Sequence, residues 1–383
     1  MDIVKFNQFV RDIYHTDQFI PLHEPRFLGN EKKYVLDTIE STFVSSVGAF
    51  VTDFENKVQK FTGCTSAIAT ANGTAALHVA LLMAGVKRED IVITQALTFV
   101  ATCNALSYIG AEPLFIDVSL KTMGLCPRAV EQYLDEYAFI NDQGECWHKA
   151  SDKRISVVVP MHTFGHPVEL DELVAVCKKW NITLVEDAAE SLGSYYKEQH
   201  TGTFGTISAL SFNGNKVITT GGGGMVMCQD EALGIRTKHI TTTAKIPHPY
   251  EFYHDENGFN YRMPNLNAAL GCAQMENLPN FLDKKRVLAK QYAEFFKGSD
   301  ATFVLEPEHC RSNYWLNAIV CADKTQREAV LQGTNVAKVM TRPIWTLMTK
   351  LPMYVNALQD HLTNSNWLEE RVVNIPSSVP LEL

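Results

Sequence analysis

Between residues 55 and 230, short apolar runs alternate with stretches of helical periodicity. The apolar runs are almost wholly hydrophobic, which is typical of strands buried on both faces, and alternation with helices indicates parallel strands. The expected strands are 91–94, 113–116, 155–160, 182–186, 208–212 and 225–228, and helices at 74–84, 99–109 and 170–180 lie between several of them. The sequence therefore predicts an α/β fold whose mostly parallel sheet is covered by helices on both faces.

The character of the chain changes near residue 250. An aromatic and polar stretch leads into a long helical pattern at 266–296, and shorter strand candidates follow at 315–320 and 339–342. We expect three parts: an N-terminal helical extension (1–20), a large domain (21–250) and a smaller C-terminal α/β domain (251–383). Within the large domain, the polar segment 139–154 is expected to form a surface excursion.

The charge of the chain excludes some classes of partner. There are 34 Lys and Arg against 43 Asp and Glu, so the net charge is −9. Nucleic acid and anionic membranes need an excess of cationic side chains, and we expect neither as a partner. No apolar run approaches the roughly 18 residues of a membrane span, and the N-terminus lacks the pattern of a signal peptide.

The nine cysteines also carry information about the compartment. Their number is odd, and none forms a Cys-x-x-Cys pair. This usage is typical of reduced thiols rather than of a disulfide framework or a zinc site. We therefore expect a cytoplasmic protein without a bound metal.

Ligands of open α/β sheets bind outside the carboxyl ends of the strands. One expected strand is followed by Asp187 and Glu190, and another by Ser211, Asn213 and Lys216. The sequence Asn72-Gly73-Thr74-Ala75 opens a helix, where free N–H groups and the helix dipole favour an anion. Taken alone, this fragment is equally consistent with an ordinary helix start.

Lys216 and Asp187 are more informative as a pair than either residue is alone. A lysine among small polar neighbours at a strand end is partly desolvated and can act as a neutral amine, whereas most single lysines and loop aspartates are solvated or cap a helix. A lysine for a Schiff base, an aspartate for a pyridinium N–H and phosphate donors are what pyridoxal phosphate needs from a protein. Phe99, at a strand-to-helix junction, is placed to stack on such a ring or to belong to the core.

Five ordered motifs, spread over nearly the whole chain from about Ile20, strengthen this interpretation. They are Asn72-Gly73-Thr74-Ala75-Ala76-Leu77, Leu97-Thr98-Phe99-Val100-Ala101-Thr102, Glu186-Asp187-Ala188-Ala189-Glu190, Ser211-Phe212-Asn213-Gly214-Asn215-Lys216, and Asn260-Tyr261-Arg262 followed by Ala268-Ala269-Leu270-Gly271. In this order the chain resembles the fold-type-I, pyridoxal-phosphate-dependent nucleotide-sugar aminotransferases of the DegT/StrS type. The fold, an aminotransferase activity and the cofactor follow as expectations from that resemblance.

The resemblance implies a role for each matching residue. Lys216 is the catalytic residue that attaches the cofactor and transfers protons, and Asp187 contacts the pyridine nitrogen. Glu190 reaches the ring hydroxyl, where the family often has Gln or His, and Phe99 stacks on the ring. The phosphate is held by the N–H groups of Thr74 and Ala75, the Ser211 hydroxyl and, from a second subunit, Asn260, which implies a homodimer with shared active sites. Gly73 and Asn213 complete the expected cofactor-binding set.

The resemblance also suggests a substrate class. The motifs at 162–167, 239–245 and 340–343 are similar to the branch that makes the 4-amino-sugar precursor of legionaminic-acid-type nonulosonic acids. This implies L-glutamate as amino donor and a UDP- or GDP-linked 4-keto-6-deoxy-N-acetylhexosamine as acceptor. Arg262 is expected to bind the donor carboxylate and His162 the sugar. The candidates for the diphosphate are Arg26, Lys32, Lys33, Lys245 and Arg342.

The sequence leaves two alternatives to this activity and gives little support to two others. A 3-keto nucleotide-sugar aminotransferase remains an alternative. A pyridoxal-phosphate-dependent sugar dehydratase has less support, because the relatives that dehydrate have histidine in place of Lys216. A nicotinamide oxidoreductase needs a glycine fingerprint, which the run 221–224 does not provide. A non-catalytic sensor would have lost the lysine.

Overall fold

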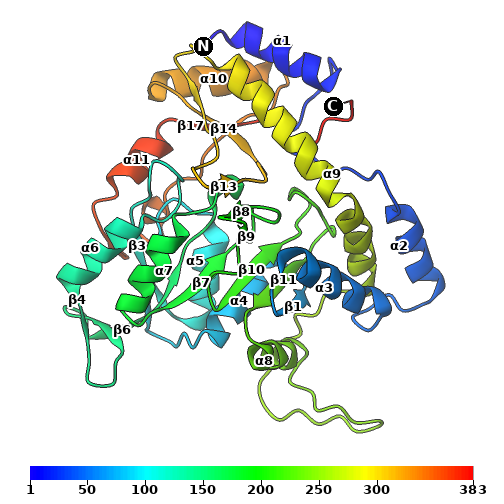
Figure 1. The fold of residues 1–383 in the computed structure, drawn as a ribbon, viewed down its shortest axis with the longest axis vertical. Coiled ribbons are helices and arrows are strands. Elements are labelled where there is room, and N and C mark those ends of the chain that lie inside the picture. The colour runs from blue at the N-terminus through cyan, green and yellow to red at the C-terminus, as the bar shows by residue number, and fades with distance from the viewer. Residues whose placement is uncertain (383) are drawn as a thin grey trace.

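The computed structural model describes residues 1–382, and its centre is a mixed sheet of ten strands within that range. The strand order is β1-β11-β10-β7-β6-β2-β3-β16, and the hairpin β4–β5 joins the edge of β6. Neighbours from β16 to β10 pair in parallel, whereas β11 is antiparallel to both β10 and β1. The bounds are β1 Ser66–Thr70, β2 Ile91–Gln95, β3 Glu112–Ile116, β4 Ala138–Ile140, β5 Cys146–His148, β6 Lys153–Val159, β7 Thr183–Asp187, β10 Ile207–Ser211, β11 Gly224–Cys228 and β16 Leu358–Gln359. The prediction of a mostly parallel α/β sheet is confirmed (Figure 1).

Helices cover both faces of this sheet because successive strand residues point to opposite sides. In β2, Ile91 and Ile93 pack with residues of α6 and α7, whereas Val92 packs on the other face with residues of α4 and α5. At the opposite end of the sheet, α3 and α9 cover the face to which Met225 and Met227 point. The helices are α2 Glu31–Glu40, α3 Ala49–Thr62, α4 Gly73–Met83, α5 Val100–Ile109, α6 Pro127–Tyr137, α7 Leu170–Lys179 and α8 Glu231–Thr241.

Two segments of the large sheet differ from the expectation. β1 was not predicted, because four of its five residues are Ser, Ala or Thr, which give little strand signal. The polar segment expected as a surface excursion lies largely at the surface and has regular structure that was not predicted: it forms the hairpin β4–β5, in which Trp147 of β5 pairs with Arg154 of β6. Its turn is closed by Asn141, whose Oδ1 accepts the N–H groups of Gln143 and Glu145.

A second, antiparallel sheet lies at the other end of the molecule, in the order β12-β14-β17-β15. Helices α1, α10 and the distal half of α9 lie beside it (Figure 1), and Phe6, Val10, Tyr292, Val373 and Ile375 share one apolar cluster there. We propose that this sheet belongs to the smaller of the two domains, although α1 packs on it and β16 returns to the large sheet. The bounds are α1 Ile3–Tyr14, α9 Asn265–Phe295, α10 Lys324–Val336, α11 Thr363–Glu369, β12 Thr302–Phe303, β14 Asn317–Val320, β15 Arg342–Pro343 and β17 Val372–Ile375; a small third sheet consists of β8 Tyr195–Tyr196, β9 Gln199–His200 and β13 Cys310–Arg311.

Helix α9 connects the two ends of the molecule and carries a fully buried lysine at its middle. Lys285 Nζ donates to the carbonyl oxygens of Ser377 (2.6 Å) and Trp315 (3.2 Å) and lies 3.1 Å from His23 Nε2. Three segments that are distant in sequence thus contact one atom.

In residues 1–382, no helix is both long enough and apolar enough to cross a membrane.

Candidate active site

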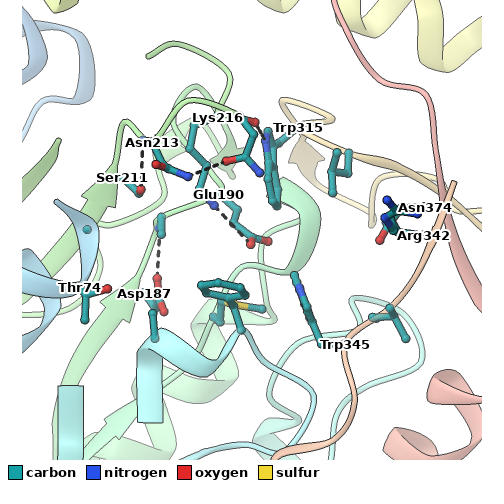
Figure 2. Close-up of a pocket in the computed structure, with 18 of the residues that line it drawn as sticks. Thr74, Asp187, Glu190, Ser211, Asn213, Lys216, Trp315, Arg342, Trp345 and Asn374 are labelled. Atoms are coloured by element: carbon teal, nitrogen blue, oxygen red, sulfur yellow. Dashed lines mark hydrogen bonds and ion pairs between the residues drawn. The ribbon is translucent and has the colours of Figure 1, made fainter. Parts of the chain in front are cut away.

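A cavity of about 590 Å³ opens where the carboxyl ends of β7 and β10 and the start of α4 meet the second sheet. Figure 2 shows Lys216, Glu190 and Asp187 on one side of it and Arg342 and Asn374 on the other. The residues predicted from sequence that line it are Gly73, Thr74, Phe99, Asp187, Glu190, Ser211, Asn213, Lys216 and Arg342.

Lys216 lies in the loop after β10, and only 13% of its side chain is exposed. Its Nζ lies 3.5 Å from Glu190 Oε1 and 3.9 Å from the centre of the Trp315 ring. A cation over an aromatic face is attracted to it, and the indole N–H of Trp315 donates to the carbonyl of Asn215 at 2.6 Å. Trp315 therefore covers the amine and also fixes the backbone of the preceding residue.

Asp187 ends β7 as a buried carboxylate. Thr102 Oγ1 donates to its Oδ2 at 2.7 Å, and the N–H of Ala189 donates to its Oδ1 at 3.2 Å. Burial raises the pKa of Asp187, against the effect of these donors and of Lys216. A cationic N–H in the cavity would offset that cost, which is what a pyridinium nitrogen provides.

The helix start at Asn72 fits a phosphate group. Gly73 and Thr74 line the cavity beside Ser211, and a Cβ on Gly73 would lie 2.8 Å from Ser211 Cβ, so only glycine lets the helix end and the strand end approach this closely. Ala75 does not fit its prediction as a phosphate donor, because its N–H donates to Asn72 Oδ1 at 2.8 Å and it does not line the cavity. Asn72 is the N-cap of α4, and its side chain already accepts the hydrogen bond of the Ala75 N–H.

Glu190 and Phe99 complete the wall around Lys216. Glu190 Oε2 accepts the N–H of Phe164 at 2.9 Å, and burial raises the pKa of Glu190 to about 7. Phe99 precedes α5 and leaves 48% of its surface exposed, and its ring centre lies 6.3 Å from that of Trp345 in a T-shaped arrangement. A partly exposed aromatic side chain that lines a cavity is suited to stack on a planar ring. Together these residues fit the cofactor that the sequence predicts.

His162 does not reach the cavity, contrary to its prediction as a sugar contact. The side chain is fully buried, and its Nε2 lies 3.0 Å from Glu186 Oε2. The same carboxylate accepts the N–H groups of Gly202, Phe204 and Gly205 at 2.7 to 2.8 Å. His162 is therefore a partner of a structural carboxylate.

Three further predicted residues lie elsewhere on the chain. Lys245 and Arg262 line a separate open depression with Thr242, Pro247, His248 and Pro249, and Asn260 is exposed and bridges to Thr242 through the backbone. Within one chain these residues do not line the cavity of Lys216. Their predicted roles, including that of Asn260 at a partner's site, stay predictions.

The cavity also contains residues that the sequence did not point to. The main ones are Trp315, Trp345 and Asn374, with Leu22 from the N-terminal loop. The one usable signal was composition: Trp315 follows Asn313 and Tyr314 in a segment with few charges, and a tryptophan beside polar residues often marks a binding surface.

Comparison with known proteins gives the context of this site. Residues 27–383 match the model of the DegT/DnrJ/EryC1/StrS aminotransferase family. The chain is 34% identical over 360 residues to the GDP-perosamine synthase of Escherichia coli O157:H7 (94% of this chain, 93% of the relative) and 30% identical over 366 residues to that of Caulobacter vibrioides (94% of each). The fold matches Helicobacter pylori PseC, an aminotransferase involved in the biosynthesis of pseudoaminic acid, with a TM-score of 0.85 at 22% identity (96% of this chain, 95% of that one).

The family match covers almost the entire chain, including every residue that lines the cavity around Lys216 and Asp187 except Leu22. Aminotransferases of this family use pyridoxal phosphate, and the relatives include a GDP-perosamine synthase and a putative pyridoxal phosphate-dependent aminotransferase of Bacillus subtilis. The chain belongs to the DegT/DnrJ/EryC1/StrS aminotransferase family and is a pyridoxal-phosphate-dependent sugar aminotransferase.

Proposed function

We propose that the protein transfers an amino group from L-glutamate to C4 of a nucleotide-linked 4-keto-6-deoxy-N-acetylhexosamine, carried on UDP or GDP. The product would be a 4-amino sugar for nonulosonic (legionaminic-type) acid or surface-glycan biosynthesis. Three relatives, each at least 30% identical to the chain, are named GDP-perosamine synthase, which supports a nucleotide-linked amino sugar and favours GDP as carrier. The N-acetyl group and the pathway are supported by the motif resemblance alone.

The observation that carries the proposal is the placement of Lys216, Asp187 and the start of α4 around one cavity. Pyridoxal phosphate, when bound, supplies a carbonyl that attaches to amines and a ring that accepts electrons from the substrate carbon. Gly73, Thr74 and Ser211 would hold its phosphate, and Asp187 would accept the hydrogen bond of its ring nitrogen. Thr102 and Ala189 fix the orientation of that carboxylate.

Lys216 would move the protons. In the first half-reaction, its Nζ takes the proton from Cα of glutamate, and in the second it delivers a proton to C4 of the sugar. Trp315 covers Nζ on one side and limits the access of water to it. Glu190, 3.5 Å from Nζ and with its pKa raised to about 7 by burial, can hold or release a proton near neutral pH.

The first test is the visible spectrum of the purified protein. We expect absorbance of a cofactor attached to Lys216 that bleaches when L-glutamate is added. Lys216→Ala should lose this absorbance and reduce turnover by at least about 10²-fold, as when a positioned acid–base group is removed. Lys197→Ala, a lysine on an exposed turn, serves as the control. Normal turnover by Lys216→Ala without added amine would contradict the assignment.

The second test identifies the acceptor. A panel of UDP- and GDP-linked 4-keto and 3-keto sugars is incubated with glutamate, and products are read by mass and NMR. An amino group at C4 supports the proposal, an amino group at C3 supports the 3-keto alternative, and loss of a hydroxyl without amination supports a dehydratase.

We also propose a homodimer in which Asn260 reaches the partner's cavity. In support, the segment between α8 and α9 exposes Tyr250, Phe252 and Tyr253 by 64% or more, and large exposed aromatics often mark interfaces. Mixing Lys216→Ala with Asn260→Ala protein should restore one site per heterodimer. Failure to regain activity after subunit exchange, or a monomer in sedimentation, would contradict shared sites.

The cytoplasm is the proposed compartment. The nine cysteines are all unpaired within residues 1–382, in keeping with a reducing environment.

A further inference from the structure

Two polar side chains face each other across the end of the cavity opposite Lys216. Arg342 of β15 and Asn374 of β17 are direct partners in the antiparallel register, so both side chains stand on one face of the second sheet. Both line the cavity, and in Figure 2 they lie side by side, with Trp315 and Trp345 between them and Glu190 in this view. One cavity therefore has the reactive lysine at one end and this pair at the other.

Asn374 lacks a partner that its burial requires. Only 4% of the residue is exposed, and its Nδ2 makes no hydrogen bond within the residues that the structure describes. Buried side-chain amides nearly always find an acceptor. An acceptor brought by a ligand in the cavity would satisfy Nδ2.

Arg342 lacks a counter-charge. Among residues 1–382 no carboxylate lies within 4 Å of its guanidinium, and Nη1 makes two long contacts of 3.4 Å, to Asn335 Oδ1 and to its neighbour's carbonyl, Thr341 O. The other cation of the cavity, Lys216, has Glu190 beside it. The end of the cavity at Arg342 is thus the place where a negative charge is missing.

We propose that Arg342 and Asn374 form an oxyanion subsite that binds a carboxylate or phosphate group of a substrate whose reacting atom lies at Lys216. The guanidinium supplies the charge and two or more N–H donors, and the Asn374 amide supplies a further donor. The proposal rests on the proposed function, because it assumes that the ligand extends from Lys216. Its two possible sources are the carboxylate of the amino donor and the diphosphate of the nucleotide sugar.

The cavity wall supports a ligand of this shape. Trp345 packs against Phe99 (6.3 Å between ring centres) and Phe164 (5.1 Å), so the stretch between the two polar ends is aromatic. Aromatic walls bind the apolar faces of sugars or aliphatic chains, and convergent polar groups at the ends fix their orientation. A molecule with an anionic group at one end and a reacting carbon at the other matches this arrangement.

The experiment compares Arg342→Gln and Asn374→Ala with wild type, all as holoenzyme. Arg128→Gln, an exposed arginine on α6 that does not line the cavity, is the matched control, and Arg342→Lys tests whether charge alone suffices. In the first arm, single-turnover bleaching of the cofactor absorbance gives the apparent Kd and the maximal rate for L-glutamate. In the second arm, calorimetry gives the Kd for GDP, UDP and inorganic pyrophosphate.

We expect Arg342→Gln to raise Kd at least tenfold in one arm, with the maximal glutamate rate within about threefold of wild type. A smaller rise for Asn374→Ala and partial recovery in Arg342→Lys are expected in the same arm. An effect on glutamate assigns the subsite to the donor carboxylate, and an effect on nucleotide or pyrophosphate assigns it to the diphosphate. Both assignments support an oxyanion subsite, because a merely structural defect would lower the maximal rate instead.

Kd values within twofold of wild type in both arms, for a variant that retains wild-type thermal stability, would overturn the subsite. That outcome is distinct from failure of the proposed function, in which the wild-type protein itself shows no bleaching with glutamate. Arg342 is exposed, so its variants are expected to fold. If Asn374→Ala unfolds, the Kd values of Arg342→Gln alone decide whether the oxyanion subsite exists.

Discussion

Replacing Lys285 by methionine should change the stability of the protein in a way that depends on pH. The amine is fully buried in the middle of α9, and burial lowers its pKa to about 7. As a neutral amine it can donate to the carbonyls of Trp315 and Ser377 and accept from His23 Nε2, which satisfies all three contacts. Methionine has similar length and removes both the titration and the donors.

The magnitude follows from the two pKa values. In the unfolded chain the pKa of Lys285 is the ordinary 10.5, so between pH 7 and 10.5 the unfolded state binds one proton more than the folded state. The free energy of unfolding therefore rises with pH by about 1.4 kcal/mol per pH unit from this group alone. Below pH 7 the lowered pKa destabilises the fold by roughly 5 kcal/mol, and above pH 10.5 that cost is absent.

Lys285→Met removes this dependence and leaves two buried carbonyls without donors, at a cost of about 1–3 kcal/mol each. The difference in unfolding free energy, wild type minus variant, should grow by about 3 kcal/mol from pH 7.5 to 9.5. Urea unfolding of the holoenzyme at three pH values measures it, with Lys290→Met, an exposed lysine on the same helix, as control. A difference that stays constant across this range would refute a neutral buried amine.

Three substitutions at the cavity give further tests. Gly73→Ala places a Cβ 2.8 Å from Ser211 Cβ and should weaken pyridoxal phosphate binding at least tenfold in a titration of the apoprotein; unchanged affinity would contradict the tight approach at the phosphate position. Asp187→Asn removes the charge and leaves one oxygen to accept from either Thr102 or Ala189, so kcat should fall by at least about 10²-fold in protein that remains folded, and a small loss would argue against pairing with the ring nitrogen. Burial raises the pKa of Glu190 from 4.5 to about 7, so ionisation of this group lowers the stability of the wild-type apoprotein as the pH rises from 4.5 to 7. The difference in unfolding free energy between Glu190→Gln and wild type, measured by urea unfolding, should therefore be larger by roughly 3 kcal/mol at pH 7.5 than at pH 4.5. An equal difference at the two pH values would contradict the raised pKa.

The part of the site that follows strand ends was predictable from the sequence. Asp187 and Ser211 end neighbouring parallel strands, and Lys216 follows five residues after Ser211. Because carboxyl ends of parallel strands meet at one edge of the sheet, residues placed there share a cavity wherever the helices pack. Two of the predicted contacts failed because a protein group occupies the side chain or N–H: Asn72 Oδ1 accepts the N–H of Ala75, and His162 pairs with the buried Glu186, and neither contact can be read from residue spacing.

The opposite wall could not be predicted in the same way. Trp315 covers Lys216 although about a hundred residues separate them, and Arg342 and Asn374 face each other only through the register of the second sheet. These contacts depend on how the second sheet packs against the first, and the buried amine on α9 fixes only the position of Trp315 and Ser377 relative to that helix.

By itself, the sequence determined the class of fold and the chemistry at one edge of the sheet, because hydrophobic period and strand ends are properties of consecutive residues. Only the tertiary structure decided which side chains close the cavity from the other side, and which of the predicted donors remain free for a ligand. Those outcomes depend on distances between segments far apart in the chain, and on which partner each buried polar group finds when the two sheets come together.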